Sequence, residues 1–120
     1  MADVFTDAGE ALIVDIIDST TAVPANWYVG WGTGADTADK TDTTLSTEAS
    51  ESRVAATMTQ PSANVNRFSA TITADGTKTI TNAGVLSAST SGTLLLFSDF
   101  SGVAVDASDS IAFQFDLTWA

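Results

Sequence analysis

A stretch rich in glycine and aromatic residues, NWYVGWGTGADT at 26–37, holds residue types that often take part in ligand binding. Its glycines, Gly30, Gly32 and Gly34, resemble half of a dinucleotide-binding fingerprint, in which amides at the start of a helix hold a phosphate. The third glycine of the GxGxxG fingerprint is missing, and so is the lysine of a phosphate-binding loop. Residues 35–44, where the helix would have to begin, are poor helix formers. The stretch is therefore not predicted to bind a nucleotide.

Three aspartates follow the glycines and raise the question of a metal site. Asp36, Asp39 and Asp42 are spaced by three residues, whereas a calcium-binding EF-hand loop uses alternate positions followed by a glycine. Asp106 and Asp109 form a second acidic pair. Because aspartate in turns commonly binds its own backbone, we expect solvated turns here, with a structural calcium as the alternative. No metal and no cofactor are predicted.

Catalytic residues are scarce in this chain. It contains neither histidine nor cysteine, which excludes Ser-His-Asp and Cys-His catalysis and histidine-ligated zinc. A glycosidase needs two facing carboxylates, but Glu48 and Glu51 lie in a polar segment and Asp116 stands alone on the last strand. Asp116 is expected to be solvated or paired with Arg67 or Arg53. The chain is predicted not to be an enzyme.

The aromatic residues of the stretch suggest sugar binding as a further possibility. Trp27, Tyr28 and Trp31 could present rings for stacking on a sugar. On a β-strand, however, Trp27, Val29 and Trp31 share one face, and such a face more often belongs to a core or a subunit interface. We therefore expect the two tryptophans to be packing anchors.

Composition limits the remaining classes of function. The 120 residues, of which 44% are hydrophobic and 16% charged, are expected to fold as a single domain, residues 1–120. Fifteen acidic against four basic residues give a net charge of −11, which disfavours binding to nucleic acid or to an anionic membrane. No apolar run is long enough to span a membrane, and no basic residue precedes Lys40, as a signal peptide would require.

A short amphipathic helix is predicted at residues 8–18. Asp7 precedes Glu10 by three residues, as in a capping box. The β-branched residues of this run leave a buried strand as the alternative. The apolar residues on one helical face are Leu12, Ile13, Ile16 and Ile17.

The rest of the chain has the pattern of antiparallel strands. The strand at 26–31 is followed by a polar segment, 32–51, whose one large apolar residue is Leu45. Further on, the Asp75-Gly76 pair predicts a hairpin between strands at 65–74 and 78–85. The fold class is mainly β: a single antiparallel β-sandwich or jelly-roll-like domain with one short N-terminal helix and a long polar loop.

Two strands are predicted near the end of the chain. A polar turn at 87–92 leads into a strand at 93–100, and Ser101-Gly102 is predicted to turn the chain into 103–105. The last strand has the clearest alternation, with one apolar face for the core and one polar face for solvent. That apolar face consists of Ile111, Phe113, Phe115, Leu117 and Trp119.

Several motifs, taken together, resemble small structural proteins of tailed bacteriophages. They are YVGWGTG, a Thr- and Ala-rich loop, LSTE followed by RV, ITNAGVLSAST-SGTLLLFSDF and DSIAFQFDLTW, and they cover most of the chain from Phe5. Related patterns occur in head decoration (cement) proteins and in products labelled tail-fibre proteins. This chain departs from the usual form at Asn82, where an acidic residue is common, and at Ser108, where glycine is common.

The resemblance implies a capsid decoration protein, made in the bacterial cytoplasm, that binds the outside of a phage head as a homotrimer. Its partners would be other copies of itself and the major capsid protein. A tail-fibre or receptor-binding tip subunit, or a carbohydrate-binding sandwich, remains the alternative. Because 32–51 is so polar, we expect it to form an arm that reaches a neighbouring protomer or the capsid. The expected interface residues are Trp27, Trp31, Gly32, Gly34, Leu45 and Arg53.

Overall fold

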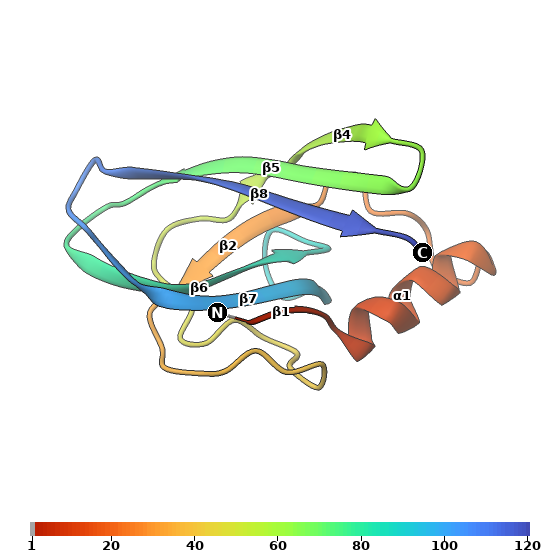
Figure 1. Ribbon diagram of the computed structural model, residues 1–120, viewed down its shortest axis with the longest axis horizontal. Coiled ribbons are helices and arrows are strands. Elements are labelled where there is room, and N and C mark those ends of the chain that lie inside the picture. Colours follow the sequence, from red (N-terminus) through yellow and green to blue (C-terminus); the bar gives the residue numbers. More distant parts are fainter. Residues whose placement is uncertain (1) are drawn as a thin grey trace.

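The computed structural model describes residues 2–120, which form two antiparallel β-sheets packed face to face and one short helix (Figure 1). The predicted antiparallel sandwich with a single N-terminal helix is confirmed. In chain order the elements are β1 (Ala2–Phe5), α1 (Asp7–Ile17), β2 (Tyr28–Gly32), β3 (Val54–Ala55), β4 (Thr57–Ser62), β5 (Val65–Thr73), β6 (Lys78–Leu86), β7 (Leu94–Val105) and β8 (Ser110–Thr118).

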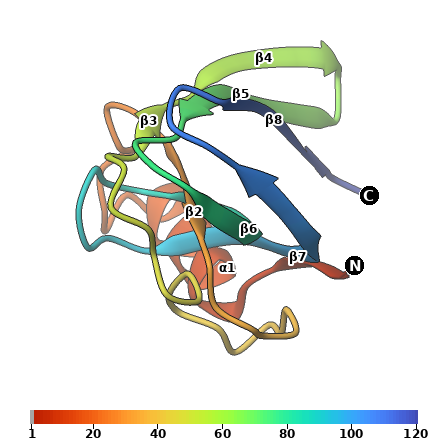
Figure 2. The ribbon, with the colours of Figure 1, turned by 90° about the vertical axis from the view of Figure 1, so that its left-hand side faces the viewer.

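The core lies between the two sheets. The larger sheet has five strands in the order β1-β7-β6-β2-β3, and the smaller has three in the order β4-β5-β8 (Figure 2). Each large apolar side chain buried between them stabilises the fold by roughly 1.5–3 kcal/mol. The buried residues include Val29, Trp31, Ala83 and Val85 from the larger sheet and Phe68, Ile72 and Leu117 from the smaller.

A single bent ribbon joins the two sheets. β6 pairs with β7 in the larger sheet, and their continuations β5 and β8 pair with each other in the smaller sheet. The chain crosses between the sheets at 74–77 and again at 106–109. There the Ala74 amide donates to the Asp109 carbonyl at 2.7 Å, and the Ser108 amide donates to the Ala74 carbonyl at 2.9 Å. The hydrogen-bonded ladder therefore continues around this end of the sandwich.

The hairpin predicted at Asp75-Gly76 is wrong, because β5 and β6 lie in different sheets. These two residues belong to the crossover, where the Asp75 carboxylate accepts hydrogen bonds from Lys78 Nζ (2.9 Å) and Ser50 Oγ (2.8 Å). β6 instead forms a hairpin with β7, and the tip of that hairpin contains Gly92 with a φ of +75°. The Asp-Gly signal is local, whereas the pairing is decided by strands far along the chain.

The turn predicted at Ser101-Gly102 is also wrong, because β7 continues through these residues. Ile80 pairs with Val103 and Asn82 pairs with Asp99, so β7 carries two more residues than β6 between these pairs. The extra residues form a β-bulge, which bends the strand without ending it.

Helix α1 lies close to its predicted position, but its first turn is capped differently. The Thr6 hydroxyl accepts the Gly9 amide at 2.9 Å and donates to the Leu94 carbonyl, so Thr6 rather than Asp7 is the N-cap. The predicted capping box is wrong, since the Glu10 carboxylate pairs with Lys40 of the polar segment 32–51. Within residues 2–120, no helix is long and apolar enough to cross a membrane.

The polar segment 32–51, predicted to extend as an arm, instead lies along the outer face of the larger sheet, below β6 and β7 in Figure 1. The Gly34 amide donates to the Ser46 carbonyl at 3.0 Å, and Gly32 forms a β-bridge with Glu48. Leu45 is only 5% exposed, and burying it explains why so polar a segment stays on the domain. Leu45 belongs to a second apolar cluster with Ala38, Leu86, Leu94 and Phe97.

Candidate functional site

The six residues expected at an interface lie in and around β2 and the loop that follows it. Trp31, Gly32 and Leu45 are buried within the chain itself. The structure thus shows how they pack inside one subunit, and their contact with a neighbour stays a prediction. The full set is Trp27, Trp31, Gly32, Gly34, Leu45 and Arg53.

The two tryptophans serve as packing anchors, as the strand pattern predicted. Trp31 is 1% exposed and meets Phe113 of the opposite sheet edge-on, with ring centroids 6.1 Å apart. Trp27 is partly buried and meets Phe68 in the same way at 6.0 Å. Because Trp31 has no exposed ring face, it cannot stack on a sugar, and the carbohydrate-binding alternative loses its main aromatic platform.

The glycines of the stretch make room for the loop that covers β2. A Cβ on Gly32 would lie 2.2 Å from the Ser46 carbonyl oxygen, and one on Gly34 would lie 2.2 Å from Ser46 Oγ. A Cβ on Gly30 would lie 2.9 Å from Leu45 Cδ1. The spacing of two places all three on the side of the chain that faces the loop. They allow close packing and do not form a phosphate cradle.

Arg53 ties the loop to the hairpin between β6 and β7. Its side chain is 7% exposed, and its Nε and Nη2 donate to the Glu48 carboxylate at 2.7 and 2.8 Å. Its Nη1 donates to the carbonyls of Ala88 and Ser91, each at 2.8 Å. Such a bidentate contact between a guanidinium and a carboxylate fixes the orientation of both side chains and neutralises their charges.

Glu51 is a central residue that we did not predict, because its partners are distant in sequence. Its carboxylate accepts Trp31 Nε1 at 2.9 Å, the Asp75 amide at 3.0 Å and Lys78 Nζ at 2.6 Å. Burial alone would raise the pKa of this side chain, which is 5% exposed. The donors outweigh burial, led by Lys78, and lower the pKa of Glu51 to about 2.

A polar groove of about 490 Å³ lies beside this cluster, between residues 48–53 and 89–91. Its charged groups are paired with each other or with nearby residues, and its remaining lining is serine and threonine. In the part of the chain that the structure describes, no buried polar side-chain atom lacks a hydrogen-bond partner. The visible role of this arrangement is to hold the loop on the larger sheet.

The aspartates considered for a metal site bind their own turns. Asp42 Oδ2 accepts the Asp39 amide at 2.9 Å, and Asp109 Oδ2 accepts the Asp106 amide at 2.8 Å. Hydrogen bonds from the Thr41 amide and hydroxyl lower the pKa of Asp39. Across residues 2–120, no group of three or more acidic side chains is placed to hold a metal ion.

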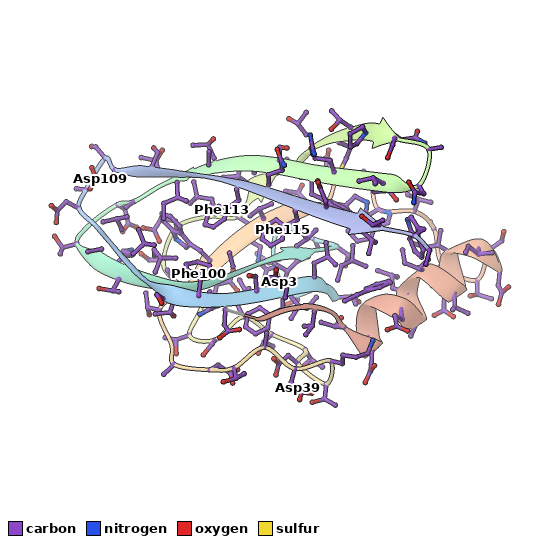
Figure 3. All side chains as sticks on the ribbon, viewed as in Figure 1. Asp3, Asp39, Phe100, Asp109, Phe113 and Phe115 are labelled. Atoms are coloured by element: carbon purple, nitrogen blue, oxygen red, sulfur yellow. The ribbon has the colours of Figure 1, made fainter. Side chains whose placement is uncertain are left out.

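A second surface, this one apolar, lies on the open side of the sandwich, between β8 and the edge of the larger sheet. A groove of about 360 Å³ there is lined by Asp3, Phe100, Phe113 and Phe115, together with Ser98 (Figure 3). The alternation in β8 predicted that Phe113 and Phe115 face the core, and they do pack against it, but both stay partly exposed.

Comparison with known families identifies the chain as a structural protein of bacteriophages. A family model matches residues 5–116, from the end of β1 almost to the end of β8, and its description is Podophage GP4 fiber I protein gp80. The chain belongs to this family. No curated protein matches the chain. The resemblance to phage structural proteins is thus confirmed, and the family description refers to a fiber rather than to a head decoration protein.

Proposed function

We propose that this chain is a non-enzymatic structural subunit of a phage particle and that it forms part of a tail fibre. The observation that carries this proposal is the family match over residues 5–116. Because the match spans both sheets, the helix and the loop, the fibre description applies to the whole domain rather than to a short shared motif. This favours the fibre over the head decoration role that we first expected.

The cluster around β2 supports a structural role. Arg53, Glu51 and Lys78, which could bind or transform a ligand in another setting, form ion pairs within the chain. The chain has no histidine or cysteine to act as a nucleophile or a proton carrier near neutral pH. What these residues do is hold a long loop against a sheet.

Assembly with further copies of the same chain is part of the proposal, and three copies is the expected number. A fibre subunit needs a stable fold, a soluble exterior and a surface that its neighbours can cover. The high negative charge provides the soluble exterior. The partly exposed apolar open side provides a surface that a neighbouring copy can cover.

Purified virions would test the location. Antibody against the chain should label the tail in electron micrographs, and quantitative mass spectrometry should find far fewer copies than of the major capsid protein. Labelling over the whole head, with a copy number near that of the major capsid protein, would establish head decoration instead. Absence of the chain from purified virions would refute both roles.

A further inference from the structure

The free edge of β8 lacks the features that usually protect an edge strand. β4, at the other edge of the smaller sheet, contains Pro61 and a break in register between Thr59 and Ser62. At the edges of the larger sheet, β3 has two residues and β1 has four. β8 has nine residues in unbroken register with β5 and contains no proline, glycine or lysine. Such an edge can accept a further strand.

Apolar side chains line the space beside this edge. Phe113 and Phe115 of β8 and Phe100 of β7 are partly buried and border the groove on the open side (Figure 3). Phe5 and Trp119 continue the strip, with their rings edge-on and centroids 5.9 Å apart.

The strip ends on helix α1, whose apolar face is only partly covered. A second, smaller groove there is lined by Phe5, Ile13 and Trp119, with Glu10 as its one charged residue. Val14 is 56% exposed and Ile17 is 76% exposed, although both lie on the side of the helix that borders this groove. These residues together form an apolar strip from the first groove to α1, and Figure 3 shows its first members, Phe100, Phe113 and Phe115, between β8 and β7.

Charge sets the smaller sheet apart from the rest of the molecule. The strands of the smaller sheet carry one acidic and one basic residue, Asp116 and Arg67, which pair at 2.8 Å. The other fourteen acidic and three basic residues, and so the whole net charge of −11, lie elsewhere. Two acidic residues do line the grooves, but Asp3 accepts a hydrogen bond from Ser98 and Glu10 pairs with Lys40. Two copies of this chain repel each other on most faces and meet with least repulsion along the smaller sheet. A cationic partner would instead bind the acidic faces.

We propose that a second copy of this chain docks on the open side, along the free edge of β8 and the apolar strip that continues to α1. This inference rests on the proposed role as an assembling structural subunit. The whole molecule measures 43 × 26 Å along its two longest axes, an outline on the order of 1,000 Å². Because a stable interface buries roughly 800 Å² per partner, the second copy would have to cover most of this side. In a trimer, the open side of each copy would face the other two.

A matched pair of charge variants tests this docking surface. Gln114→Glu places a negative charge on the exposed face of β8, and Gln60→Glu makes the same change on β4, the opposite edge of the same sheet. We expect Gln114→Glu to raise the dissociation constant of the oligomer at least about tenfold, because like charges would then meet at the interface. Gln60→Glu should change it less than about twofold. Sedimentation velocity over a range of concentrations measures both.

Hydrogen–deuterium exchange of the wild-type oligomer gives a second readout that requires no substitution. Amides on the free edge of β8 should exchange more slowly than those on the free edge of β4, and this protection should disappear on dilution to monomers. Equal exchange at the two edges, equal effects of the two variants, or a wild-type chain that stays monomeric would each overturn the inference. Detection of the chain in virions tests the proposed function separately, so either proposal can fail alone.

Discussion

The Glu51 carboxylate connects the end of the covering loop to β2 through Trp31, to the crossover between the sheets through the Asp75 amide, and to the start of β6 through Lys78. A buried carboxylate with this many donors is stabilising only while it is ionised. The stability of the fold should therefore depend on pH in a predictable direction.

We expect Glu51→Gln to lower the free energy of unfolding by about 2 kcal/mol at neutral pH, because the contact with Lys78 loses its charge. The pKa of Glu51 is lowered from 4.5 to about 2, so its contribution is full above about 4.5 and is lost as the pH falls toward 2. The difference between wild type and variant should shrink over the same window in urea denaturation. Asp116→Asn, which removes an exposed ion pair, is the control and should change stability much less. A difference independent of pH would contradict this account.

Gly32→Ala tests the close contact between β2 and the loop. The added Cβ would lie 2.2 Å from a backbone oxygen, so the loop must shift, and we expect a loss of roughly 1–3 kcal/mol in unfolding free energy. Gly76→Ala is the matched control, since a Cβ there meets no heavy atom within 4 Å and its φ is not positive. Thermal denaturation should show a lower melting temperature for the first variant and no decrease for the second.

Residue roles that depend on one strand were predictable, and those that depend on distant partners were not. The alternation around Trp27 and Trp31 correctly predicted packing anchors, and the Arg67–Asp116 pair was one of two pairings expected. Glu51 was overlooked because Lys78 lies across a strand pairing that no local pattern reveals. Asn82, where an acidic residue is common in related patterns, holds Ser46 through both its amide oxygen and its amide nitrogen.

At the scale of elements, the loop over the larger sheet is the segment whose behaviour differed most from expectation. Its composition is typical of an exposed arm, yet Leu45 and the backbone bonds to β2 hold it in place. Composition averages over a segment and so misses a single well-placed apolar residue.

Leu45→Ala should release this loop. We expect a loss of about 3 kcal/mol in unfolding free energy, because Leu45 is 5% exposed and sits among other buried apolar side chains. Amides of residues 34–49 should also exchange faster with deuterium. Val23→Ala, at a site that is 66% exposed, should change neither quantity appreciably. A loop that stays equally protected in Leu45→Ala would show that other contacts hold it.

Elements with strong local periodicity were placed correctly, whereas connections between them were not. The helix, the last strand and the strand before the 87–92 turn follow their predicted positions closely, and the strand after that turn begins as predicted but continues to Val105. The connections at Asp75-Gly76 and Ser101-Gly102 failed because a turn signal indicates a bend without saying which strands it joins. The same glycine-containing pattern that marks a hairpin turn is also compatible with a bulge within a strand and with a crossover between sheets.

At the scale of the whole molecule, net charge should control association. Copies that each carry a net charge of −11 repel one another even when their contact surfaces are neutral. We expect added salt to tighten the oligomer, lowering its dissociation constant at least about threefold, because salt screens repulsion beyond roughly 10 Å at 0.1 M. Sedimentation at low and high salt would measure this. Weaker association at high salt would show that ion pairs dominate the interface.

The bent ribbon also determines how this molecule can fold. The hairpin between β6 and β7 closes a short turn, so it is the least costly long-strand pairing to form first. Pairing can then extend residue by residue through the crossover into β5 and β8, and this places the smaller sheet over the larger one. Neither layer can then be lost without breaking a ladder that they share, so both sheets should unfold in one cooperative step.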